Sequence, residues 1–261
     1  MLQTATLTLS TGSELTLGPL SVPWHGLTTA LGLGVGTMVA LRFARERNLS
    51  AERILNLVLL VTLTGMVGAR AFFLIEQDPG ALLRPVDWFA NTGFSFYGAM
   101  IAAVAAALIY LRGTLTLLYL DALASGFGLA MAVGRIGDIL IGEHIGSPSD
   151  LPWAISYSNP DALVPMTGVA YHPGALYESV LGLAIFAALW PQRQRFRRPG
   201  SLLLAVVGLY SAGRFALFFV RSDSDALALG LSNAQVTSIL MVVGCGAAYI
   251  WVRRRGEPKQ G

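Results

Sequence analysis

Seven runs of apolar residues, each close to the length of a membrane crossing, constrain what this chain can fold into. They lie at 26–42, 54–75, 94–112, 115–135, 174–190, 201–220 and 234–252. A helix needs about 20 consecutive apolar residues to cross the hydrocarbon core of a bilayer. The composition agrees, because 54% of the 261 residues are hydrophobic and only 13% are charged. We therefore expect an all-α polytopic membrane protein with about seven transmembrane helices, folded as a single membrane domain over residues 1–261.

The positions of the cations predict how these helices are oriented. Of the 18 lysines and arginines, all but five follow the first, third, fifth or seventh run and would lie on one side of seven crossings. That side is cytoplasmic by the positive-inside rule, which places the N-terminus outside and the C-terminus inside. The other five, at the outer ends of runs or in outer loops, are candidates for binding an anion: Arg70, Arg84, Arg135, Arg214 and Arg221.

Two polar stretches are expected on the outer side. Residues 1–23 lack a basic region followed by an apolar one, so we expect no cleavable signal peptide but an outer segment with a strand or hairpin. Residues 143–173 form the longest polar stretch and predict a small extracytoplasmic cap over the helices. The single cysteine, Cys245, lies in the last apolar run, where a buried thiol is a poor nucleophile.

The sequence from Val133 to Gly146 concentrates polar chemistry directly after an apolar run. It contains Arg135, Asp138, Glu143 and His144 together with four glycines. An ionised side chain at the centre of a bilayer costs about 2.5–3.5 kcal/mol, so such groups usually pair inside a protein or face a wet cavity. The glycines predict a helix that loosens or breaks here, which is tolerated only where the backbone lines a cavity.

This stretch resembles the signature Gly-Arg-x-Gly-Asn-x3-Asn-Gly-Glu of the prolipoprotein diacylglyceryl transferase family, inner-membrane enzymes of bacteria. Residues 171–178 are similar to the family's His-Pro-x-Gln-Leu-Tyr-Glu segment, and residues 210–223 to its Gly-x-x-Arg-Phe-x-x-Glu-Phe-x-Arg-x-x-Asp segment. The matching residues with functional groups are Arg135, Glu143, His172, Tyr177, Glu178, Arg214 and Arg221.

The resemblance implies an activity and its partners. Family members move the diacylglyceryl group of phosphatidylglycerol to the lipobox cysteine of a prolipoprotein and release glycerol phosphate. The implied partners are phosphatidylglycerol, a prolipoprotein and the bacterial inner membrane, with no nucleic acid, cofactor or metal. Arginine suits the lipid phosphate because its planar fork binds bidentately and keeps its charge.

The resemblance also suggests roles for individual residues. Arg135 and Arg214 would hold the phosphate, with Arg70 as a weaker third candidate, and Glu143 would orient an arginine or a headgroup hydroxyl. Arg221 could instead snorkel to the outer interface. The remaining implied substrate-binding residues are His172, Tyr177 and Glu178.

Three positions depart from the family pattern. Tyr97 stands where the family has a histidine, Asp138 where it has an asparagine, and Phe218 where it has a glutamate. His25 in turn occupies a tyrosine's place, so His25 and Tyr97 could have exchanged positions across one cavity. Asp138 could pair with Arg135 or serve as a base. The catalytic candidates are thus Arg135, Glu143, Arg214, His25, Tyr97 and Asp138.

These departures leave two other functions open. One keeps an anionic phospholipid as donor and uses a different acceptor. The other is a catalytically silent membrane protein that binds lipid and retains the charged residues as a buried ion network.

Overall fold

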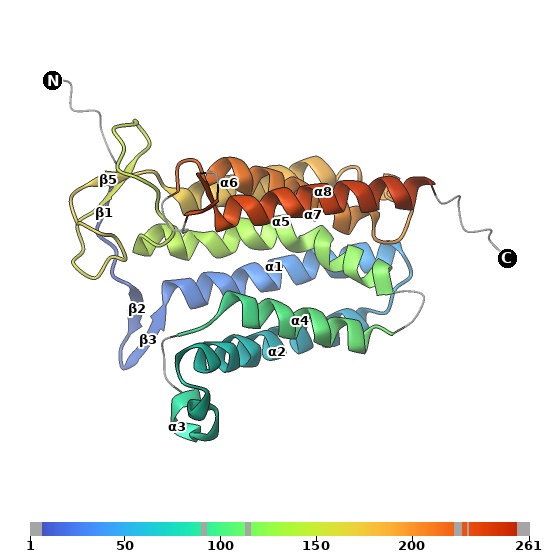
Figure 1. Cartoon of the computed structure of the whole chain (residues 1–261), viewed down its shortest axis with the longest axis horizontal. Coiled ribbons are helices and arrows are strands. Elements are labelled where there is room, and N and C mark those ends of the chain that lie inside the picture. The colour runs from blue at the N-terminus through green and yellow to red at the C-terminus, as the bar shows by residue number, and fades with distance from the viewer. Residues whose placement is uncertain (1–6, 90–92, 113–115, 222–225, 229, 255–261) are drawn as a thin grey trace. The chain divides into compact units, whose positions relative to one another are not determined.

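The computed structural model describes residues 7–89, 93–112, 116–221, 226–228 and 230–254 (Figure 1). Its helices are α1 (Trp24–Glu46), α2 (Ala51–Gln77), η1 (Pro79–Leu83), α3 (Pro85–Trp88), α4 (Phe96–Tyr110), α5 (Thr116–Ile141), α6 (Gly174–Leu189), η2 (Arg193–Arg195), α7 (Ser201–Leu217) and α8 (Asn233–Arg254). Its strands are β1 (Leu7–Leu9), β2 (Glu14–Leu17), β3 (Leu20–Pro23), β4 (Ile155–Tyr157), β5 (Ala170–Tyr171), β6 (Ala226–Ala228) and β7 (Leu231–Ser232).

A helix occupies each apolar run of the sequence, so the prediction of a mostly helical protein is confirmed. Within the described ranges, four helices are long and apolar enough to cross a membrane: α1, α2, α5 and residues 233–252 of α8. The apolar helices α4, α6 and α7 are shorter. Helix α7 ends at Leu217, earlier than the predicted run, and Phe218 caps it.

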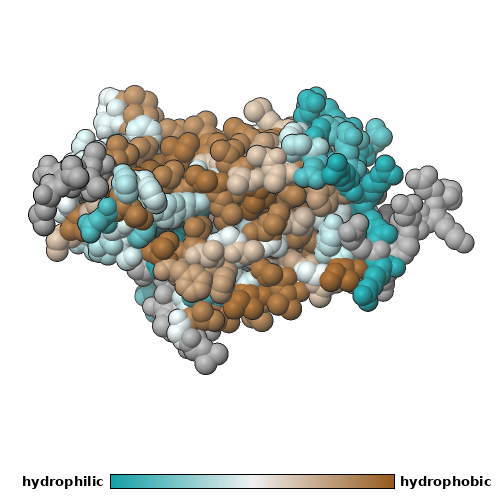
Figure 2. Space-filling model, turned by 90° about the horizontal axis from the view of Figure 1, so that it is seen from above, coloured by the Kyte–Doolittle hydropathy of each residue, from teal (hydrophilic) through white to brown (hydrophobic). Residues whose placement is uncertain are grey.

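Large apolar side chains cover much of the helical surface. Leu59 on α2, Leu183 on α6 and Val243 on α8 are each more than half exposed. Figure 2 shows hydrophobic residues over the middle of the visible face and hydrophilic ones gathered toward its ends. A soluble monomer rarely exposes this many large apolar side chains along its helices. The hydrocarbon core of a bilayer accommodates it.

The chain divides into two compact units, one comprising residues 1–40 and 123–261 and the other residues 41–122. In the first unit α6 packs against α7 and α7 against α8, while α5 meets α6 where a Cβ on Gly128 would lie 2.5 Å from the carbonyl oxygen of Gly182. The small sheets lie at the end where α5 stops (Figure 1). In the second unit α2 packs closely along α4. A Cβ on Gly68 would lie 2.6 Å from the carbonyl oxygen of Gly98, so these two backbones are in contact. The single membrane domain stays a prediction.

The polar segments of the first unit form strands. Strands β2 and β3 make the expected N-terminal hairpin, with Glu14 opposite Pro23. Strand β1 pairs in parallel with β4, and β4 pairs with β5, so the segment 143–173 is held by a three-stranded sheet. Burial raises the pKa of Tyr157 in β4 to about 12. Its hydroxyl therefore stays protonated and donates to the carbonyl of Ile139 at 2.8 Å, which ties this sheet to the end of α5.

Candidate active site

The predicted break in this glycine-containing stretch occurs at Gly142. The helix runs unbroken through Gly137 to Ile141 and stops at Gly142, whose φ of 78° lies in the left-handed region. A Cβ on Gly137 would lie 2.6 Å from the carbonyl oxygen of Trp24, so this glycine lets the start of α1 touch α5. Gly137 therefore serves close helix packing, while Gly142 ends the helix.

Thr28 fixes this contact between α1 and α5, and sequence analysis did not identify it. Its hydroxyl is buried, donates to the carbonyl of Gly134 at 2.8 Å and accepts from the amide of Gly137 at 3.1 Å. The bonds hold the first turn of α1, which carries His25, against the part of α5 that carries Asp138. Nothing in the sequence distinguishes Thr28 from other helical threonines, since the partner backbone is more than 100 residues away.

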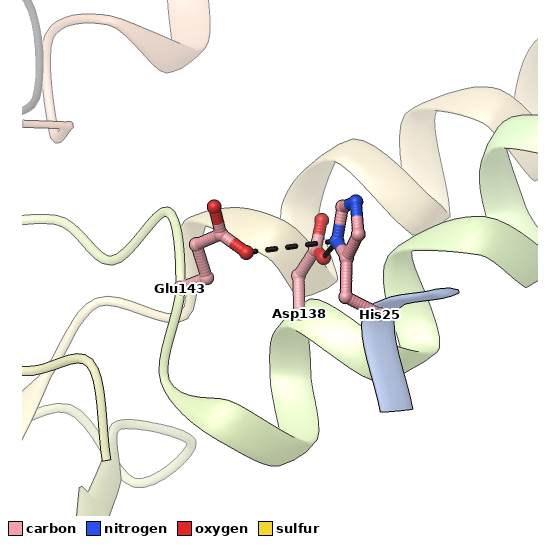
Figure 3. A group of neighbouring side chains, drawn as sticks. All are labelled: His25, Asp138 and Glu143. Atoms are coloured by element: carbon pink, nitrogen blue, oxygen red, sulfur yellow. Dashed lines mark hydrogen bonds and ion pairs between the residues drawn. The ribbon is translucent and has the colours of Figure 1, made fainter. Parts of the chain in front are cut away.

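His25, Asp138 and Glu143 converge at this point (Figure 3). His25 Nδ1 lies 2.5 Å from Asp138 Oδ1 and 3.6 Å from Glu143 Oε2. Asp138 is 1% exposed, whereas the His25 side chain is 50% exposed. Arg135 Nη1 donates to the other oxygen of Asp138 at 2.6 Å, which confirms the predicted pairing of Asp138 with Arg135.

These three residues bring one possible ligand atom each within 4.8 Å of one another, close enough for a metal ion. Both oxygens of Asp138 are already engaged, one by His25 and one by Arg135. A divalent cation would also sit beside the guanidinium of Arg135 and be repelled by it. We therefore assign no metal to this cluster.

Glu178 on α6 is the centre of a second cluster. It is fully buried, and three arginines reach it: Arg135 of α5 at 2.6 Å, Arg214 of α7 at 3.4 Å, and Arg221 in close contact. An uncompensated buried charge is costly, so these partners explain how Glu178 can be ionised here. Sequence analysis placed Glu178 among the substrate-binding residues but gave no indication that three arginines share it.

Arg221 lies beyond the end of α7 at Leu217. Its side chain is 3% exposed, so it points inward to Glu178 and does not snorkel to an interface. Arg221 Nη2 lies 3.1 Å from His144 Nδ1, and because a guanidinium only donates, the imidazole nitrogen accepts. The ring of Phe218 lies 4.7 Å from the Arg214 guanidinium and 4.5 Å from that of Arg221, so both cations stack on it.

A cavity of about 250 Å³ opens beside these clusters. Its polar wall contains His25, Arg135 and Asp138, and its other wall includes Leu33 and Met131. The volume is below the roughly 300–1,000 Å³ of sites that enclose a whole ligand of drug size. It suits a polar headgroup whose acyl chains stay outside in the lipid.

His172 and Tyr177 form a smaller group at the start of α6. His172 Nδ1 lies 3.1 Å from the Tyr177 hydroxyl, and Trp153 of the segment 143–173 donates its indole N–H to the same hydroxyl at 2.9 Å. Trp153 was not singled out from the sequence, although a tryptophan in a polar segment is a signal for such a contact. The segment 143–173 therefore touches α6 one residue before Glu178.

The remaining two candidates lie in the second unit. Arg70 is buried, and its donors reach the carbonyl oxygens of Asp87 at 2.9 Å and Gly93 at 2.8 Å. Tyr97 is in the first turn of α4 and 55% exposed. The exchange of His25 and Tyr97 across one cavity stays a prediction.

Comparison with known proteins supports the sequence resemblance. The family model for prolipoprotein diacylglyceryl transferase matches residues 14–251. A phosphatidylglycerol–prolipoprotein diacylglyceryl transferase of Clostridioides difficile is 29% identical over 93% of this chain and 95% of the relative. Those of Thermosynechococcus vestitus and Geobacillus kaustophilus are 31% and 32% identical, over 89% and 93% of both chains. The match includes both clusters of charged residues, and the chain belongs to the prolipoprotein diacylglyceryl transferase family.

Proposed function

We propose that this protein transfers the diacylglyceryl group of phosphatidylglycerol to the cysteine thiol of lipobox-containing prolipoproteins. The observation that carries this proposal is the sharing of one buried carboxylate, Glu178, by three arginines beside a cavity. A guanidinium has about five N–H donors, and the contacts of Arg135 and Arg214 described below do not use all of theirs. The oxygens of a lipid phosphate are acceptors that these two arginines could bind.

Arg135 and Arg214 would bind the phosphate. Arg135 Nε is buried and has no hydrogen-bond partner among the described residues, so Asp138 and Glu178 do not use all of its donors. The Arg214 side chain is 32% exposed, and its 3.4 Å contact to Glu178 is long for an ion pair. Both therefore retain capacity for a ligand, and both would stabilise the glycerol phosphate as it leaves.

The other members of the site would support these two arginines. Glu178 would hold the arginines in place without touching the lipid, since it is fully buried. Arg221 would share that role. Glu143, whose side chain is 35% exposed, would orient the headgroup. His172 and Tyr177, next to Trp153, would contact the substrate from the cap segment.

The proposal includes the placement in the membrane. We propose seven crossings of a bacterial inner membrane, formed by α1, α2 and α4 to α8, with the N-terminus outside and the C-terminus in the cytoplasm. The residues 143–173 would then form an extracytoplasmic cap. This orientation puts the arginine clusters between α1 and α2 and between α6 and α7 in the cytoplasm, as the positive-inside rule requires.

The test is transfer of labelled diacylglyceryl from phosphatidylglycerol to a lipobox peptide by the purified protein in detergent. Arg135→Ala should lower kcat/KM about 100- to 1,000-fold, the usual effect of removing one donor to a developing negative charge. Arg53→Ala removes an exposed arginine at the first turn of α2 and serves as the matched control with full activity.

Two outcomes would contradict the proposal. An Arg135→Ala protein as active as the control would show that the cluster does not hold the donor. A wild-type protein that binds phosphatidylglycerol through Arg135 but transfers nothing to a lipobox peptide would require another acceptor or a purely lipid-binding role.

A further inference from the structure

His25 and Asp138 form a pair that phosphate binding does not require. A negatively charged residue 2.6 Å from Arg135 weakens its attraction for a phosphate, so Asp138 is unfavourable for donor binding alone. Asp138 is nevertheless buried and held by two hydrogen bonds, one of them to a histidine that lines the cavity. This arrangement indicates a second chemical task.

The geometry sets which nitrogen of His25 can react. With Asp138 ionised, its carboxylate only accepts, so Nδ1 carries the hydrogen in the bond between them. The neutral ring then has its lone pair on Nε2. Figure 3 shows this second nitrogen turned away from both Asp138 and Glu143. The side chain is half exposed, and it lines the cavity together with Arg135.

We propose that the His25–Asp138 pair is the general base that takes the proton from the acceptor's cysteine thiol. The inference rests on the proposed function. His25 Nε2 would accept the thiol proton, and Asp138 would hold the tautomer and stabilise the imidazolium that forms, as a carboxylate does for a catalytic histidine. His25 is then a catalytic residue and Asp138 a positioning residue.

The step balances within the two substrates. The sulfur electron pair forms the new bond to the glyceryl carbon of phosphatidylglycerol, and the bond between that carbon and the phosphate oxygen breaks with its electrons on oxygen. The thiol proton moves to His25 Nε2 and from there to the released glycerol phosphate, which restores the neutral imidazole. No oxidant, reductant or metal takes part.

The other groups near the cavity are less suited to this role. Asp138 itself is 1% exposed with both oxygens engaged, so it cannot meet a thiol. His144 accepts a hydrogen bond from Arg221, and His172 is bonded to Tyr177. His25 is the one of the three histidines that lines the cavity.

Three charged groups face the imidazole. Asp138 and Glu143 lie 2.5 Å and 3.6 Å from its Nδ1, and Arg135 is bonded to Asp138. The pair can therefore receive a proton while the arginine beside it receives the phosphate, so that thiol and phosphate sites share one wall of the cavity.

The experiment compares His25→Gln with wild type in the same transfer assay across pH. At pH 7 we expect kcat to fall about 100-fold or more, the usual loss when a general base is removed, while KM for phosphatidylglycerol changes by less than about twofold. The difference in kcat between His25→Gln and wild type should become smaller above about pH 8.5, where a thiol ionises without a base. A structural role would give a deficit that does not depend on pH.

A peptide with selenocysteine in place of the lipobox cysteine provides the second measurement. A selenol is already ionised at neutral pH, so His25→Gln and Asp138→Asn should both regain most of the lost rate with it. If His25→Gln fails to fold, Asp138→Asn can replace it in the test. Its loss of transfer rate should likewise appear with the thiol peptide and not with the selenol peptide.

The outcomes separate this inference from the proposed function. If His25→Gln retains more than about a tenth of the wild-type transfer rate at pH 7, His25 is not the general base, while the proposed transferase function still holds. A selenol peptide that rescues neither variant also overturns it. A wild type inactive on both peptides overturns the proposed function itself.

Discussion

The two units each bury an arginine, but they satisfy it in different ways. In the first unit Arg135 pairs with the carboxylates of Asp138 and Glu178 beside a cavity. In the second unit Arg70 donates to the backbone carbonyls of Asp87 and Gly93 and stacks near Phe73 and Phe94. The exposed fraction alone would not distinguish Arg135 from Arg70, since both side chains are largely inside the protein.

The difference teaches that the partner, more than the burial, indicates what a buried arginine does. An arginine bonded only to backbone carbonyl oxygens holds the backbone in place and has a structural role. Carboxylates shared among several arginines neutralise charge while leaving donors for an anion. The following experiments test this contrast.

The largest effect on stability should come from Glu178, the carboxylate that three arginines share in the first unit. Glu178→Gln leaves three arginines without their common carboxylate and should cost about 3–5 kcal/mol of stability. The melting temperature in detergent should then fall by roughly 6–20 °C. Glu143→Gln, at a half-buried carboxylate, is the control and should change stability by less than about 1 kcal/mol. Equal melting temperatures for both variants would mean that Glu178 does not organise the cluster.

Arg135→Lys tests whether the shape of the guanidinium is required as well as its charge. A lysine cannot hold Asp138 and Glu178 at once and also bind a phosphate bidentately. We expect transfer to fall about 10- to 100-fold, less than for Arg135→Ala. Full activity with lysine would reduce the role of this residue to a point charge.

Arg70→Met tests whether the buried arginine of the second unit has a structural role only. Loss of the guanidinium leaves the carbonyl groups of Asp87 and Gly93 without this donor, at up to about 1–3 kcal/mol for each partly buried acceptor. Thermal unfolding should register this cost, while KM for phosphatidylglycerol stays within about twofold. A tenfold or greater rise in KM would instead support the sequence-based assignment of Arg70 to the phosphate and would remove the contrast drawn above.

Phe218→Leu should have a smaller effect. It removes the ring on which Arg214 and Arg221 stack, an interaction typically worth about 0.5–2 kcal/mol. We expect a drop in stability of about 1 kcal/mol and a modest rise in KM for phosphatidylglycerol. Phe215→Leu, whose ring packs against Phe219 instead, is the matched control. Identical behaviour of the two variants would show that the stacking is incidental.

The smallest expected effect is that of a chelator. Because Arg135 occupies one oxygen of Asp138, we expect EDTA treatment and zinc addition to leave the rate of transfer unchanged. A reversible loss of activity in EDTA would reopen the cluster of His25, Asp138 and Glu143 as a metal site.

The sequence predicted the helical fold and named most of the charged residues that the structure brings together in the candidate site. Length and apolarity indicate helices because a bilayer leaves the backbone few alternatives. The pairing of Arg135 with Asp138 was also accessible, since residues three apart lie on one helical face. The packing role of Gly137 could not be predicted, because a glycine that permits a helix contact and one that permits a break look alike in sequence.

The sequence by itself determined that the protein is a helical membrane protein, which charged residues adjoin its apolar runs, and which family pattern they fit. Only the tertiary structure decided that three arginines from separate segments share Glu178, that His25 bonds Asp138 across 113 positions of the chain, and that Arg70 bonds the backbone carbonyls of Asp87 and Gly93. Apolar periodicity is a local property of the chain, whereas the partner of a buried charge is chosen by the packing of helices far apart in sequence.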